Sequence, residues 1–236
     1  GCLMFLGCPF RLILRLAGGD WNAILGFVGF AVGIGAGTFF LKRGYSLKRT
    51  YSLPKFDTAV MPVLMVGLLI LVVMAPAFIF FSEKGPGAVH AFWAVSLIAG
   101  IVVGGLAQYT RLCMVGGIRD IILFHETKLL MGFVAVFVAA FLVNLAFGNF
   151  HPGFANQPIA HTDGLWNFLG MALAGFCSIL LGGCPMRQLI MTGEGNTDSA
   201  ITVLGLVIGA AFAHNFGLAA GGNGPTFNGE VAVVLG

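Results

Sequence analysis

The chain has 236 residues, of which 58% are hydrophobic and only 9% are charged. Soluble domains carry about 25% charged residues, so this composition excludes an ordinary soluble domain and indicates an integral membrane protein. The formal net charge of +3 is small, and the basic residues form no run long enough to indicate nucleic-acid binding.

Apolar runs approaching the roughly 20 residues that cross a bilayer recur along the whole chain. In chain order, spans are predicted at about 1–16 (broken at Pro9), 21–41, 59–81, 88–106, 129–147, 165–181 and 200–216. We therefore predict an all-α polytopic membrane helical bundle with short broken, re-entrant helices. It is expected to form a single transmembrane domain over 1–236. The first residue is a glycine inside an apolar segment, as expected for an N-terminally truncated chain.

The placement of charges predicts the topology. Five of the twelve lysines and arginines fall in one loop, 42–57, which the positive-inside rule places in the cytoplasm. The loop 148–164 has no lysine or arginine and is predicted to lie outside. Its histidine His161 is expected to be solvated. Near the N-terminus, the side chain of Arg15 is long enough to snorkel to the membrane–water interface.

A short motif occurs twice, and it is the most informative feature of the chain. Gly7-Cys8-Pro9-Phe10-Arg11 near the start recurs as Gly183-Cys184-Pro185-Met186-Arg187 near the end. An odd number of predicted crossings separates the two copies, so they would face opposite sides of the membrane. Such inverted repeats with broken helices are typical of transporters with a site near the midplane. The repeat halves are predicted at about 1–106 and 107–236.

The motif predicts an anion-attracting helix end. Proline is favoured at the first position of a helix, so each proline would begin a short helix with the preceding cysteine as its cap. The free N–H groups of a helix N-terminus attract anions. Arg11 and Arg187 fall in the first turn and add a positive charge. A thiol is a weak hydrogen-bond donor that suits a soft, polarisable ligand such as sulfur or selenium in an oxyanion.

A third cysteine, Cys113, lies in the interrupted segment 108–128. Gly116-Gly117 is predicted to break a helix just after it, and Arg119 and Asp120 are expected to pair or to cap a half-helix. The other two cysteines, Cys2 and Cys177, are expected to pack in the core, although Cys177 would also suit a second thiol station beneath Cys184. The cysteine and histidine spacings predict no metal site, and we expect no cofactor.

These motifs resemble those of the YeeE/YedE family of sulfur-compound transporters, and the sequence around Cys113 and Cys184 is most similar to its selenium-transport branch. The resemblance implies uptake of thiosulfate, or a related sulfur or selenium species, across a bacterial inner membrane. It also implies a central line of cysteines, here Cys8, Cys113 and Cys184, that pass the anion by thiol hydrogen bonds. A small cytoplasmic sulfurtransferase-like partner is a further implication.

Two other functions remain open at this point. A membrane thiol oxidoreductase or persulfide-relay protein would need cysteines close enough to form disulfides. A plain ion channel would use its cysteines only for packing. We expect a transporter or channel rather than an enzyme, with Arg11, Arg119 and Arg187 supplying positive potential around the three cysteines.

Overall fold

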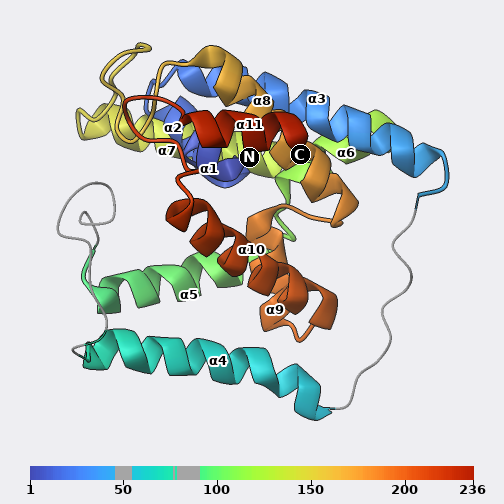
Figure 1. The fold of residues 1–236 in the computed structure, drawn as a ribbon, viewed down its shortest axis with the longest axis vertical. Helices are drawn as coiled ribbons and strands as arrows, with labels where there is room; N and C mark the ends of the chain where they lie inside the picture. The colour runs from blue at the N-terminus through green and yellow to red at the C-terminus, as the bar shows by residue number, and fades with distance from the viewer. Residues whose placement is uncertain (46–54, 77, 79–90) are drawn as a thin grey trace.

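The computed structural model describes residues 1–45, 55–76, 78 and 91–236 (Figure 1). Over these residues the chain forms helices and has two isolated β-bridges, which confirms the predicted all-α fold. Lys48 and Arg49 of the predicted basic loop, and the predicted link 82–87, lie outside the described residues. The helices are α1 (Cys2–Phe5), α2 (Pro9–Ala17), α3 (Asn22–Lys42), α4 (Lys55–Met74), α5 (Trp93–Tyr109), α6 (Met114–Phe124), α7 (Lys128–Ala146), α8 (Gly164–Leu180), α9 (Pro185–Gly193), α10 (Thr197–Asn215) and α11 (Phe227–Leu235).

Five helical segments of the described chain are long and apolar enough to cross a membrane. Large apolar side chains are exposed along α4, α5, α7 and α10, as expected where helices face lipid tails. The chain is therefore a multi-pass membrane protein. The five segments are Asn22–Lys42, Trp93–Phe124, Lys128–Ala146, Gly164–Gly193 and Thr197–Asn215.

The closest helix pairing joins α3 and α8, which run side by side along the upper edge of Figure 1. Gly29 and Gly33 of α3 lie so close to α8 that a Cβ atom on either would collide with the carbonyls of Phe168 and Ala172. Gly175 of α8 meets the carbonyl of Phe30 in the same way. Small residues let membrane helices approach closely, so Gly29 and Gly33 form a glycine stripe on α3 that packs against α8.

The remaining helices are arranged in two further groups. Figure 1 shows α2 and α7 in the upper part, and α4, α5, α9 and α10 in the lower part. The short helix α9 contacts α4, α5 and α10, and α6 contacts α3, α7 and α8. Each of these two short helices therefore contacts three longer helices.

The structure departs from the sequence predictions at three places. Arg15 does not snorkel: its side chain is buried and pairs with Asp20, with 2.7 Å between Nε and Oδ2. His161 is not solvated either, because it is buried with its Nε2 2.8 Å from the carbonyl oxygen of Met4. The glycine-rich tail contains the helix α11, which the sequence analysis did not predict.

Candidate functional site: thiols at two helix N-termini

Both copies of the duplicated motif fold as predicted. Pro9 and Pro185 each begin a helix of nine residues, α2 and α9, and the preceding cysteine is the N-cap. The cap dihedrals are nearly the same, with φ −80° and ψ 168° at Cys8 and φ −70° and ψ 162° at Cys184. The two motifs therefore present a thiol and free N–H groups in the same local geometry.

The structure also explains why each motif begins with glycine and ends with arginine. The stem of Arg11 folds back over Gly7, so that a Cβ on Gly7 would lie 2.9 Å from the Arg11 Cδ. The stem of Arg187 covers Gly183 in the same manner, with a Cβ there 3.3 Å from the Arg187 Cγ. The glycine thus leaves room for the arginine stem beside the cysteine cap.

Cys113 caps a third helix end. Its sulfur accepts a hydrogen bond from the backbone N–H of Gly116 at 3.4 Å, which makes it the N-cap of α6. The predicted break after Cys113 is wrong in position, because Gly116 and Gly117 lie inside α6 and the break precedes the cysteine. A Cβ on Gly117 would lie 3.2 Å from the backbone nitrogen of Leu130, so the glycine pair instead allows α6 to approach α7.

The thiols of Cys113 and Cys184 lie within hydrogen-bonding range of each other. The Cys113 thiol is also in range of the backbone N–H of Cys184, and the Cys184 thiol is in range of those of Met114 and Arg187. Both cysteines are buried, with exposed fractions of 8% and 2%. The N-termini of α6 and α9 therefore meet at one point, and each thiol lies next to N–H groups of both helices.

Two helix N-termini and two arginines lie around this thiol pair. Each helix N-terminus carries about half a positive charge. Arg119 acts electrostatically on the Cys113 thiol and pairs with Asp120, its Nη2 lying 2.8 Å from Oδ1, which confirms the predicted pairing. Arg187 donates from Nη1 to the Oε1 of Gln108 at 3.1 Å, and its Nη1 lies 3.7 Å from a carboxylate oxygen of Glu194.

Cys8 belongs to a second group of thiols. The Cys2 thiol is within electrostatic range of both Cys8 and Cys177. The structure thus pairs Cys184 with Cys113, and it associates Cys8 with Cys2 and Cys177. The expected packing of Cys177 in the core is wrong, because this residue is exposed, whereas Cys2 is half-buried. Arg11, in the first turn of α2, has a buried Nε without a hydrogen-bond partner among the described residues.

A comparison with protein families identifies the chain. A family model described as sulphur transport matches residues 109–228. The chain belongs to this family, the YeeE/YedE sulfur transport family. The matched region contains the thiol pair and extends from the end of α5 into α11. No curated protein and no solved structure matches the chain.

Membership of this family makes the chain a sulfur-compound transporter. Cys113, Arg119, Cys184 and Arg187 lie inside the matched region, whereas Cys8 and Arg11 precede it. The sequence analysis missed one contributor to the site, Gln108, whose side chain accepts the hydrogen bond from Arg187. The only sequence signal for it was an amide side chain at the end of an apolar span.

Proposed function

We propose that the protein takes up a small sulfur- or selenium-containing anion such as thiosulfate, and that the anion passes between the thiols of Cys113 and Cys184. The observation that carries this proposal is the meeting of two buried thiols at two helix N-termini. Buried N–H groups and S–H groups without competing water favour an anion that accepts several hydrogen bonds.

The chemistry of the site favours a soft anion over a hard one. Thiosulfate carries a polarisable terminal sulfur as well as oxygens, so it can accept both the weak S–H bonds and the stronger N–H bonds. A neutral thiol can donate to the anion and release it, whereas a thiolate would repel it. Weak donors suit conduction, because a transported ion must bind well enough to enter and weakly enough to leave.

The second group of thiols extends this passage. Cys177 lies in the last turn of α8, seven residues before Cys184, and it is within electrostatic range of Cys2, as Cys8 is. We propose that Cys8 is a further station on the same line, with Arg11, Arg119 and Arg187 supplying positive potential along it. The shared cap geometry of Cys8 and Cys184 supports an origin as repeat halves.

The proposed setting follows from the charge pattern and the family. We propose that the protein lies in a bacterial inner membrane with the loop 42–57 in the cytoplasm. A cytoplasmic sulfurtransferase-like protein would receive the imported sulfur there. Lysine and arginine cluster in that loop, and the loop 148–164 on the other side has neither.

A second candidate function is a membrane thiol oxidoreductase or persulfide relay. One observation favours it, namely that the Cys113 and Cys184 thiols are close enough to interact. In that case the two cysteines would alternate between a dithiol and a disulfide, and the two electrons and two protons released on oxidation would pass to an external acceptor such as a quinone. The protein isolated during turnover would then contain mixed disulfides at one of them.

Uptake of radiolabelled thiosulfate into proteoliposomes tests the proposal. We expect uptake by the wild-type protein, strong loss in Cys113→Ser and Cys184→Ser, and inhibition by an excess of a selenium-containing anion. Wild-type rates in both serine variants would overturn the proposed passage. Mass spectrometry of protein recovered during uptake separates the two candidates, because transport without covalent chemistry leaves the cysteines unmodified.

A further inference from the structure

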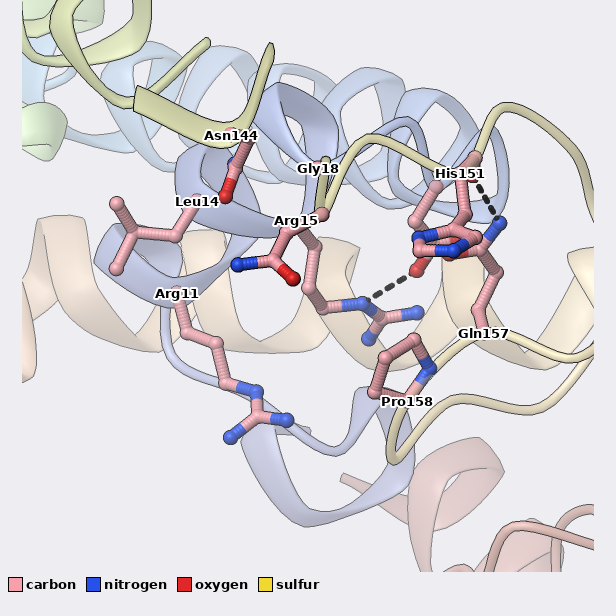
Figure 2. A pocket seen from close by; sticks show the side chains of 10 residues that line it. Arg11, Leu14, Arg15, Gly18, Asn144, His151, Gln157 and Pro158 are labelled. Atoms are coloured by element: carbon pink, nitrogen blue, oxygen red, sulfur yellow. Dashed lines mark hydrogen bonds and ion pairs between the residues drawn. The ribbon is translucent and has the colours of Figure 1, made fainter. Parts of the chain in front are cut away.

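A cavity of about 450 Å³ lies beside α2, and neither Cys113 nor Cys184 is among the residues that line it (Figure 2). Its walls come from α2, from the turn that follows it, from the end of α7 and from the loop 148–158. A water molecule takes about 30 Å³ of liquid volume, so the cavity has room for an oxyanion with part of its hydration shell. The lining residues that the argument uses are Arg11, Arg15, Asp20, Asn144, His151 and Gln157.

The charges in the cavity do not cancel. Arg11 and Arg15 bring two positive charges, and Asp20 brings the only carboxylate among the lining residues. Asp20 is already paired with Arg15, because its Oδ2 accepts a hydrogen bond from the Arg15 Nε at 2.7 Å. Its other oxygen accepts from the backbone and side-chain nitrogens of Asn22, both at 2.9 Å. Arg11 therefore contributes a positive charge that no acidic group of the cavity neutralises.

Two guanidinium nitrogens in this cavity are buried without a partner. They are the Nε of Arg11 and the Nη2 of Arg15, neither of which has a hydrogen-bond acceptor in the part of the chain that the structure describes. Arg15 is more than nine-tenths buried, and its remaining nitrogens are held by Asp20 and by the carbonyl of Phe5. A buried donor without an acceptor costs about 1–3 kcal/mol, and more when it is charged, so an anion at this point would be strongly favoured.

The arginines and the loop opposite them are held in place. Arg15 is fixed by its pair with Asp20 and by stacking of its guanidinium 4.1 Å from the centre of the Phe5 ring. Gln157 donates to the carbonyls of His151 at 2.7 Å and Gly153 at 3.0 Å, which fixes the far wall. Figure 2 shows the Arg15 guanidinium beside Pro158, and the Arg11 guanidinium below α2 and to the left of them. Arg15 and the far wall are therefore fixed before an anion binds.

We propose that this cavity is a docking site for a divalent tetrahedral oxyanion, the class to which thiosulfate and sulfate belong. The role of this site is to bind the anion before it reaches the cysteines, and this role rests on the proposed transport function. Arg11 connects the two regions, because its guanidinium lines the cavity while its stem covers Gly7 beside the Cys8 cap. A fixed positive site of this kind raises the local concentration of the anion.

Binding of thiosulfate and of sulfate to the purified full chain, measured by calorimetry, tests the site. Arg11→Gln removes the unneutralised charge, and Asn144→Asp places a negative charge in the wall with little change of shape. We expect each to raise the Kd for thiosulfate about tenfold or more. Arg43→Gln and Asn215→Asp make the same changes at exposed positions, just after α3 and at the end of α10, and should leave the Kd unchanged.

Three results would overturn the site: wild-type protein that does not bind either anion, equal affinity in Arg11→Gln, or chloride binding as tight as that of thiosulfate. The Cys113→Ser variant separates this proposal from the transport function. It should bind thiosulfate with the wild-type Kd although it does not transport it. If the wild-type protein binds thiosulfate and Arg11→Gln weakens this binding, but the wild-type protein transports no thiosulfate, the docking site stands and only the proposed function is contradicted.

Discussion

Replacement of Cys113 by serine and by alanine separates its structural role from its role in transport. The Cys113 sulfur accepts the N–H of Gly116 at 3.4 Å and so caps α6. Serine also provides a capping acceptor, whereas alanine provides none. Both substitutions remove the thiol, so both are expected to abolish thiosulfate uptake, although only alanine removes the cap.

The expected difference in stability follows from the cap. Loss of an oxygen cap costs about 0.5–2 kcal/mol, and a sulfur acceptor is weaker, so we place the loss in the alanine variant at about 0.5–1 kcal/mol. For a chain of this length that corresponds to a lowering of the Tm by roughly 1–4 °C. The serine variant is expected to keep the wild-type Tm or exceed it.

Thermal unfolding in detergent, followed by tryptophan fluorescence, measures the stability, and proteoliposome uptake measures the activity of the same preparations. An alanine variant as stable as the serine variant would refute the capping role. A serine variant that transports at the wild-type rate would refute the need for a thiol at this position.

Three further predictions follow from the packing and the charges. Gly33→Ala should lower the free energy of unfolding by about 1–3 kcal/mol, because its Cβ collides with the Ala172 carbonyl. Gly35→Ala on the same helix meets open space and should not lower it. Equal Tm values for the two variants would contradict the close α3–α8 contact. Asp20→Ala leaves Arg15 buried without its ion-pair partner and should lower the free energy of unfolding by about 3–5 kcal/mol. Size-exclusion chromatography would show this as a loss of folded protein. A wild-type yield would argue that the pair does not stabilise the fold. Arg187→Lys keeps the positive charge and should retain more uptake than Arg187→Gln, and equal rates in the two would show that the charge is not used.

Sequence patterns were sufficient to predict the long apolar helices and the local form of the duplicated motif, although not α11. Long apolar runs fix membrane helices because backbone groups in lipid must be satisfied within the helix. Proline at the first helical position and cysteine before it are local features, so the caps at Cys8 and Cys184 follow from neighbouring residues alone. The glycine stripe of α3 was predictable for the same reason, since its spacing is that of one helix face.

The pairing of distant groups could not be predicted in this way. Nothing in the sequence distinguishes Cys113 from Cys8 as the partner of Cys184, because the choice depends on how the fold brings the N-termini of α6 and α9 together. The burial of Arg15 and His161 is likewise set by tertiary contacts, with Asp20 and with the Met4 carbonyl. A polar residue near a span end looks the same in the sequence whether it faces water or a buried partner.

Reversible cross-linking of Cys113 to Cys184 tests most directly whether the anion passes between these two thiols. Mild oxidation by oxygen with a copper–phenanthroline catalyst should join them, as mass spectrometry of the peptides can verify, since the thiols already lie in contact range. The account predicts that cross-linked protein in proteoliposomes loses thiosulfate uptake and regains it after treatment with a reductant. Verified cross-linked protein that transports thiosulfate at the original rate, or thiols that do not cross-link, would contradict it.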